Sequence, residues 1–185
     1  IDLQELHLIS LFKVTELPQM QRKIIYQCAI SLDGFIEDHE GKFDWCLTDF
    51  DFDMQAFLDN IDTILYGRKT FEVFLNMGEV PDPTKTHYVF SSRKEDQYLY
   101  GKWIQTDAVA FVQDLTMQEG KDIWLMGGAT LAGSLAEAGL VDELQLAVHP
   151  IALGRGTPLF KGLHRRLPYF PYHSQTYSNG LTMVY

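Results

Sequence analysis

The chain has 185 residues, of which 46% are hydrophobic and 22% are charged, and its formal net charge at pH 7 is −10. This length supports one substantial hydrophobic core, so we expect a single domain. The acidic balance argues against nucleic-acid binding, which usually requires a basic face, although a few local cations can still hold a small anion. No apolar stretch approaches the roughly 18 residues that a membrane span requires, and no signal-peptide pattern is visible. We therefore expect a cytoplasmic protein that binds neither nucleic acid nor a membrane.

Residues 1–22 carry a mixed pattern of Leu, Ile, Glu and His that leads to Pro18. We treat them as a leader of unknown role. No linker, repeat or low-complexity segment divides the remainder, so we treat residues 23–185 as one folded domain.

Cysteine and histidine usage indicates no metal centre. Cys28 and Cys46 have neither a metal-like nor a redox-like spacing, and Cys28 lies in an apolar run where a thiol behaves as a small hydrophobe. The six histidines are scattered, with no pair at ligand spacing on one predicted helix. The sequence therefore predicts no metal site.

From Lys23 onward, β-rich and helical patterns alternate. Strands are predicted over residues 23–31, 61–67, 86–92, 102–106 and 122–126, and helices over residues 49–60, 68–78, 108–117 and 131–138. Asp33-Gly34 ends the first strand with turn chemistry, and Asp107 can cap the third helix. Strands separated by helices are typical of a largely parallel sheet that is covered on both faces.

The last third of the chain contains β-rich runs without intervening helical patterns. Residues 142–153 form a long β-rich run, and residues 169–185 hold two shorter runs joined by Ser178-Asn179-Gly180. Asn-Gly is the strongest short hairpin signal, so the α/β body is expected to finish in antiparallel strands.

Three strand ends carry residues suited to an anion. "YGRKT" opens a helix with a glycine and two cations, "FSSR" ends a strand with two hydroxyls and a guanidinium, and "MGGAT" removes side chains at the start of the last helix. The carboxyl ends of parallel strands share one edge of the sheet, where open α/β proteins bind ligands. Taken singly, each piece is also explained by a turn, a solvated loop or surface cations. Neither G-x-G-x-x-G nor the G-x-x-x-x-G-K-[ST] loop is present.

The order of these motifs resembles a known family. The matching pieces are "AISLDGFIED" (29–38), "YGRKTFE" (66–72), "FSSR" (90–93), "IWLMGGATLAGSLAEAGLVDEL" (123–144) and "PIALGRGTPLF" (150–160). From about Lys23 to Tyr185 the chain resembles the dihydrofolate reductase-like superfamily, most closely the C-terminal reductase domain of bifunctional riboflavin-biosynthesis proteins. The resemblance implies a three-layer αβα fold, with a central mixed sheet that is mostly parallel and has antiparallel C-terminal strands. It also implies NADPH as hydride donor and a homodimer formed through those C-terminal strands.

The resemblance also implies roles for individual residues. Ala29 and Ile36 would line the nicotinamide, and the two glycines of "MGGAT" would be joined by a cis peptide, as in related proteins. The residues expected to contact the adenosine, its 2′-phosphate and the pyrophosphate are Gly67, Arg68, Lys69, Thr70, Ser91, Ser92, Arg93, Gly127, Gly128, Ala129, Thr130 and Leu131.

The sequence indicates the substrate-binding residues less specifically than the cofactor-binding residues. Ser31 and Asp33 are candidate catalytic residues that would orient a small-molecule substrate, but Asp33 can equally close the turn before Gly34 by bonding its own backbone. Asp51 falls roughly where dihydrofolate reductases keep a buried carboxylate, although an exposed acid at a helix start is the favoured interpretation. Gln27 replaces a lysine that usually serves the phosphorylated riboflavin intermediate.

The sequence therefore leaves three candidate functions open. The leading one is an NADPH-dependent reductase of a small pyrimidine- or pteridine-type heterocycle, similar to 5-amino-6-(5-phosphoribosylamino)uracil reductase. The alternatives are dihydrofolate reductase proper and a non-catalytic nucleotide-binding protein.

Overall fold

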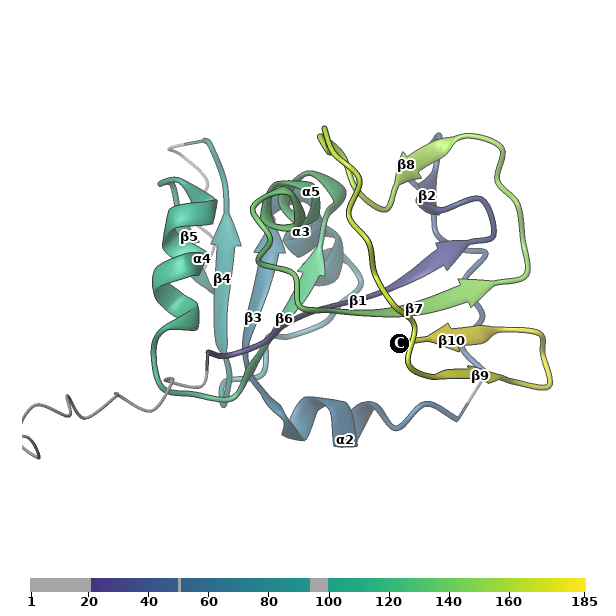
Figure 1. Cartoon of the computed structure of the whole chain (residues 1–185), viewed down its shortest axis with the longest axis horizontal. Helices are drawn as coiled ribbons and strands as arrows, with labels where there is room; N and C mark the ends of the chain where they lie inside the picture. Colours follow the sequence, from purple (N-terminus) through teal and green to yellow (C-terminus); the bar gives the residue numbers. More distant parts are fainter. Residues whose placement is uncertain (1–20, 50, 94–99) are drawn as a thin grey trace, which may run out of the picture.

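The structure, a computed structural model, describes residues 21–49, 51–93 and 100–185, and centres on an eight-stranded sheet (Figure 1). The strand order is β5-β4-β3-β6-β1-β7-β10-β9. The strands are β1 (Ile24–Ser31), β3 (Ile61–Gly67), β4 (Thr86–Phe90), β5 (Lys102–Ile104), β6 (Asp122–Gly127), β7 (Glu143–His149), β9 (Ser174–Thr176) and β10 (Thr182–Val184). All pairs from β5 to β7 are parallel, whereas β10 runs antiparallel to both β7 and β9. The predicted mixed sheet is confirmed.

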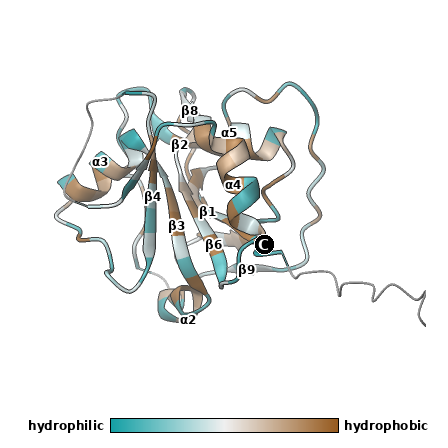
Figure 2. Ribbon diagram, turned by 90° about the vertical axis from the view of Figure 1, so that its left-hand side faces the viewer, coloured by the Kyte–Doolittle hydropathy of each residue, from teal (hydrophilic) through white to brown (hydrophobic). Residues whose placement is uncertain are grey.

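Helices cover both faces of this sheet (Figure 2). They are α2 (Met54–Asp59), α3 (Arg68–Asn76), α4 (Ala108–Thr116) and α5 (Ala129–Glu137). Within β1, Ile24 and Tyr26 pack with the core residues of α4 and α5, while Ile25 packs with those of α2 and α3. Because a central parallel strand buries both of its faces, its sequence reads as one continuous apolar run. The three-layer αβα arrangement is confirmed.

Some element boundaries differ from the prediction. The helix expected over residues 49–60 begins at Met54, because the Asp53 carboxylate accepts a hydrogen bond from the amide of Ala56 (2.9 Å) and caps it there. The strand expected over residues 142–153 ends at His149, where the amide of Ile151 turns back to donate to the His149 carbonyl (2.8 Å).

A second, two-stranded sheet was not predicted. It pairs β2 (Phe35–Asp38) with β8 (Gly156–Pro158) in antiparallel fashion and packs beside β1 (Figure 1). Both strands are very short, and β8 consists of a threonine between a glycine and a proline, so neither carries a clear strand pattern. They fall within two of the family motifs, 29–38 and 150–160.

The described part of the chain begins at Gln21, two residues before Lys23. Arg22 is buried and donates to Asp62, to Thr63 (2.7 Å) and to the carbonyl of Lys121 (2.5 Å). The rest of the predicted leader, residues 1–20, lies outside the described residues. Across the described ranges, no helix is long and apolar enough to cross a membrane, and no group of three or more His, Cys, Asp or Glu side chains is arranged to hold a metal ion.

Candidate active site

Two neighbouring strands end side by side and continue into helices on opposite faces. β3 and β6 are parallel partners, with Leu65 opposite Leu125 and Tyr66 opposite Gly127. α3 follows β3 onto one face, and α5 follows β6 onto the other (Figure 2). In open α/β sheets this divergence opens a crevice at the carboxyl ends of the strands, where ligands bind.

Two glycines face each other across the floor of this crevice. A Cβ atom on Gly67 would lie 3.2 Å from the amide nitrogen of Gly128, and one on Gly128 would lie 3.0 Å from Oγ1 of Thr70. Gly127 has a φ of +112°, which residues with a side chain rarely adopt, and its bond to Gly128 is cis. The doubled glycine therefore lets two strand-to-helix joints meet backbone to backbone.

The helices that leave these joints begin without a side-chain cap. The N-cap residues of α3 and α5 are Gly67 and Gly128, whereas aspartates cap α2 and α4 with bonds of 2.9 and 3.0 Å to first-turn amides. The first amides of a helix have no acceptor within the helix, and together with the helix dipole they favour an anion. The two uncapped helix starts are thus suited to hold phosphate groups.

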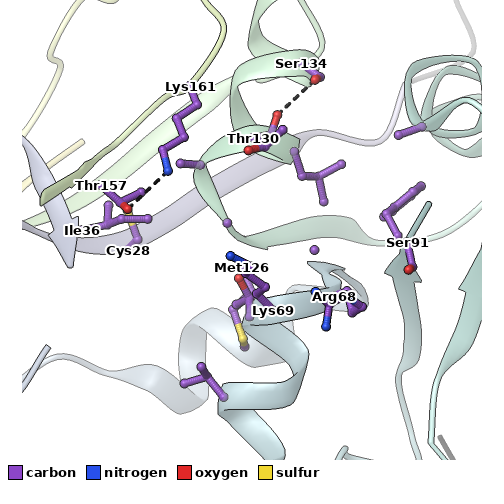
Figure 3. Close-up of a pocket in the computed structure, with 18 of the residues that line it drawn as sticks. Cys28, Ile36, Arg68, Lys69, Ser91, Met126, Thr130, Ser134, Thr157 and Lys161 are labelled. Atoms are coloured by element: carbon purple, nitrogen blue, oxygen red, sulfur yellow. Dashed lines mark hydrogen bonds between the residues drawn. The ribbon is translucent and has the colours of Figure 1, made fainter. Parts of the chain in front are cut away.

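A cavity of about 890 Å³ opens above these joints. Figure 3 shows Thr157, Lys161, Ile36 and Cys28 on one side of it and Ser91 on the opposite side. The predicted cofactor residues that line it are Ala29, Ile36, Gly67, Arg68, Lys69, Thr70, Ser91, Ser92, Arg93, Gly128, Ala129, Thr130 and Leu131. Gly127 lies outside the lining. The structure brings the predicted strand ends to one cavity, and their role in cofactor binding stays a prediction.

The cations at the joints differ in how their charge is compensated. Arg68 Nη1 donates to both carboxylate oxygens of Glu72 (2.6 and 2.7 Å), so much of its charge is neutralised within α3. Lys69 is exposed on the same turn. The backbone of Arg93 is fixed, because its amide donates to Ser91 Oγ (3.1 Å) and its carbonyl accepts from the Gln105 side chain (3.0 Å). Lys69 and Arg93 are therefore better placed than Arg68 to meet an anion.

Part of the cavity wall beside β1 is apolar. It includes Ala29, Ile36 and Phe43 together with both cysteines. Burial raises the pKa of the Cys28 thiol to about 12 and that of the Cys46 thiol to about 11. Both thiols are thus protonated at neutral pH, which makes them poor nucleophiles and suits a hydrophobic ligand surface.

Three polar side chains that the sequence did not single out also line this side. Thr157 Oγ1 donates to Glu37 Oε1 (2.6 Å), and Lys161 Nζ donates to Thr157 Oγ1 (3.4 Å). We call these residues the Glu37–Thr157–Lys161 cluster. Its sequence signal was present in part, because Thr157 lies inside the matching "PIALGRGTPLF" segment and Lys161 follows it directly.

The two candidate catalytic residues lie elsewhere. Ser31 is buried and donates to Asp33 Oδ1 (2.6 Å), while Asp33 also accepts from the amides of Leu153 (3.1 Å) and Gly154 (2.7 Å). The Ser31 hydroxyl, followed by the Leu153 amide, lowers the pKa of Asp33 to about 2. Neither Ser31 nor Asp33 lines the cavity. Their catalytic role stays a prediction, and the structure shows that Asp33 joins the turn after β1 to residues 153–154.

A buried histidine holds the segment that carries Phe43 and Cys46. His149, at the end of β7, accepts a hydrogen bond at Nδ1 from the amide of Leu47 (3.0 Å), and its ring meets the Trp45 ring edge-on at 5.3 Å. Burial lowers the pKa of His149. A neutral imidazole is required here, because protonated Nδ1 cannot accept the Leu47 bond.

Two other positions considered for the substrate side lie away from the cavity. Asp51 is exposed in the segment before α2, in agreement with the favoured interpretation. Gln27 is half-buried within β1, and its carbonyl accepts from the Trp124 indole (3.4 Å). Neither belongs to the cavity lining.

A three-layer αβα fold with a cavity at a point of strand divergence defines an α/β protein of the dihydrofolate reductase-like type. Residues 22–183 match the RibD C-terminal domain family. The chain belongs to this family.

Individual relatives agree with this assignment. The chain is 39% identical to uncharacterized protein YyaP of Bacillus subtilis over 176 residues, which cover 89% of this chain and 94% of YyaP. The structure of the chain is similar to that of a Shewanella sp. PV-4 protein assigned by name to riboflavin biosynthesis, with a TM-score of 0.75, 26% identity and coverage of 88% and 96%. A dihydrofolate reductase of Enterococcus faecalis, solved with NADP(H), shares the fold with a TM-score of 0.61, 20% identity and coverage of 89% and 95%.

Proposed function

We propose that this chain is an NADPH-dependent reductase of a small pyrimidine- or pteridine-type heterocycle, similar to 5-amino-6-(5-phosphoribosylamino)uracil reductase. The observation that carries the proposal is the meeting of two uncapped helix starts at Gly67 and Gly128, on the floor of one cavity. Membership of the RibD C-terminal domain family, and the NADP(H) held by the Enterococcus reductase, support the same conclusion.

The residues present fit a phosphorylated nicotinamide cofactor. The bare backbone at Gly67 and Gly128 leaves room for a pyrophosphate against the first-turn amides of α3 and α5. Ser91, Ser92 and Arg93 at the end of β4 offer hydroxyls and a guanidinium for the 2′-phosphate. When bound, NADPH supplies the hydride.

The apolar side of the cavity is suited to the acceptor ring. Ala29 and Ile36 would line the nicotinamide, and Phe43 with the two protonated thiols would cover a flat neutral acceptor ring beside it. In the overall reaction a ring carbon of the acceptor gains a hydride, the adjacent ring atom gains a proton, and NADPH becomes NADP⁺.

Nucleotide titration and turnover test the proposal separately. NADPH should bind more tightly than NADH when nicotinamide fluorescence is followed, and NADPH should be oxidised in the presence of members of a panel of pyrimidines, pterins and quinones. Absence of NADPH binding would overturn the proposal. Turnover confined to dihydrofolate would favour dihydrofolate reductase proper, and binding without any turnover would favour the non-catalytic alternative.

We also propose that the protein is a homodimer formed through its C-terminal strands. The segment leading into β9 exposes two aromatic side chains, Phe170 at 84% and Tyr172 at 69%, and apolar surface of this kind is commonly covered by a partner. Light scattering tests this directly, since a monomeric mass at micromolar concentration would exclude it.

A further inference from the structure

The two-stranded sheet beside β1 directs an acidic side chain into the cavity. The pairing of β2 with β8 shifts register between Phe35 and Glu37, so the strict alternation of side chains is broken and both Ile36 and Glu37 line the cavity. A Cβ atom on Gly156 would lie 2.1 Å from the carbonyl oxygen of Glu37. Glycine at 156 therefore permits the close strand approach that sets Thr157 opposite Glu37.

The hydrogen bonds of the Glu37–Thr157–Lys161 cluster have a fixed direction. A threonine hydroxyl has one proton, and the 2.6 Å bond gives it to Glu37 Oε1, so Thr157 must accept from Lys161 Nζ at 3.4 Å. The hydroxyl thus separates the two charges, which form no direct ion pair in the described part of the chain. Figure 3 shows the Lys161 side chain reaching Thr157.

Each charged group keeps unused hydrogen-bonding capacity. Within the described residues, Glu37 Oε2 has no hydrogen-bond donor, and the other ammonium protons of Lys161 have no acceptor. Glu37 Oε2 stands beside Gly41, which has no side chain to cover it. The backbone of Lys161 is anchored on the first turn of α5, because its amide donates to the Ala129 carbonyl (3.0 Å). One acceptor and one donor are therefore presented together at the apolar side of the cavity.

On the basis of the proposed reductase function, we infer that Glu37 and Lys161 select an acceptor ring with a lactam edge, in which an N–H lies next to a C=O. The Glu37 carboxylate accepts the ring N–H, and the Lys161 ammonium donates to the ring carbonyl. A ring without this N–H leaves the carboxylate unpaired in a partly buried site, which a polar pocket rejects strongly.

The same pair of charges disfavours a phosphorylated acceptor. A phosphate placed against Lys161 would also lie near the Glu37 carboxylate, and like charges at close range repel. The selected acceptor is therefore an unphosphorylated lactam-bearing heterocycle.

Binding of two matched probes tests this inference. Lumazine, a fluorescent pteridinedione, carries lactam N–H groups, and its doubly N-methylated derivative lacks them. Both are titrated by fluorescence into the protein, with saturating NADP⁺ and without nucleotide. Lumazine should bind at least about tenfold more tightly than the methylated probe, as expected for one hydrogen bond to a charged group.

Variants separate recognition from folding. Glu37→Ala should lower lumazine affinity about tenfold and leave the methylated probe unchanged, so that selectivity disappears. Thr157→Val should reduce selectivity and Thr157→Ser should restore it, because serine keeps the hydroxyl. Glu40→Gln, which changes an exposed carboxylate outside the cavity lining, is the matched control and should behave as the wild type.

The outcomes distinguish this inference from the proposed function. Equal wild-type affinities for the two probes, or unchanged selectivity in Glu37→Ala, would overturn the role of Glu37 while normal NADPH binding left the reductase proposal intact. Absence of NADPH binding would overturn the reductase proposal, and the titration without nucleotide would still decide the role of Glu37. If Glu37→Ala fails to fold, as judged by thermal melting, the wild-type probe pair and the Thr157 variants still test the lactam selectivity.

Discussion

Gly67 and Gly128 approach so closely that a Cβ atom on the first would lie 3.2 Å from the amide nitrogen of the second. The two residues end neighbouring parallel strands and start helices on opposite faces of the sheet. A side chain on Gly67 would press on the Gly128 backbone, and one on Gly128 would meet the Thr70 hydroxyl. The contact therefore explains why a strand-to-helix joint carries adjacent glycines despite their entropic cost.

Gly128→Ala should lower NADPH affinity, because the new Cβ atom lies 3.0 Å from Thr70 Oγ1 and projects into the cavity. Overpacking of this kind costs about 1 to 3 kcal/mol. The double variant Gly128→Ala with Thr70→Ala removes the internal clash and should recover the melting temperature. If the phosphates lie against Gly128, the double variant should still bind NADPH weakly in a fluorescence titration, and full recovery of affinity would contradict that placement.

Arg93→Ala should weaken NADPH binding by about 1 to 3 kcal/mol and leave NADH binding nearly unchanged, since NADPH alone carries the 2′-phosphate. Lys69→Ala is the matched variant, because Lys69 stands at the α3 start, where both cofactors would place their pyrophosphate. It should weaken both cofactors alike. Equal losses for NADPH and NADH in Arg93→Ala would remove the proposed 2′-phosphate contact.

Asp33→Asn should destabilise the protein and leave NADPH affinity unchanged, because Asp33 joins the turn after β1 to residues 153–154 and lies outside the cavity lining. The pKa of Asp33, lowered from 3.8 to about 2, means that the unfolded chain binds more protons in this range. The stabilising effect is therefore present above pH 3.8 and is lost as the pH falls towards about 2.

Thermal melts along an acid series check this prediction, with Asp114→Asn on the exposed face of α4 as control. The melting temperature of Asp33→Asn should change less steeply in acid than that of the wild type. A large loss of turnover at an unchanged melting temperature would instead support a catalytic role for Asp33.

His149→Asn should flatten the pH dependence of stability in mild acid. Burial lowers the pKa of His149 below its ordinary value of 6.5, so the unfolded state binds the proton first and wild-type stability falls as the pH drops below 6.5. Asparagine does not titrate and offers an oxygen to the Leu47 amide. The melting temperature of the His149→Asn variant should therefore depend less on pH.

His87 also contributes to the pH dependence of the melting temperature. Burial also lowers the pKa of His87, so a residual slope of the same sign remains in His149→Asn. His39→Asn, on the exposed turn after β2, should retain the wild-type slope. A wild-type slope in His149→Asn would show that the Leu47 bond does not control the acid response.

Much of the fold could be predicted from the sequence, because its physical signals are local. The continuous apolar run of β1 and the helical spacing after Gly128 each follow from burial of nearby residues. The hairpin at Asn179-Gly180 follows from turn chemistry, and β9 and β10 do pair across it. The gathering of three strand ends at one cavity followed from the rule that parallel strands share a carboxyl edge.

The acceptor side of the site could not be predicted, because its contacts are distant in the chain. Glu37 reaches Thr157 through a bulge and a glycine contact that neither segment shows by itself. The sequence left open whether Asp33 orients a substrate or closes a turn. The amides of Leu153 and Gly154, to which Asp33 binds, lie far along the sequence.

The segment from Thr157 to Lys161 serves both halves of the cavity at once. Thr157 belongs to the acceptor side, while the amide of Lys161 donates to Ala129 in the first turn of α5. Gly133, further along α5, lies so close to Lys161 that a Cβ atom there would be 1.8 Å from the Lys161 carbonyl oxygen. An insertion or a bulkier residue in this stretch would shift the first-turn amides of α5, proposed to face the phosphates, together with the proposed substrate contacts. Attempts to broaden the substrate range should therefore vary Phe43 and leave this stretch intact, since cofactor affinity would otherwise change along with specificity.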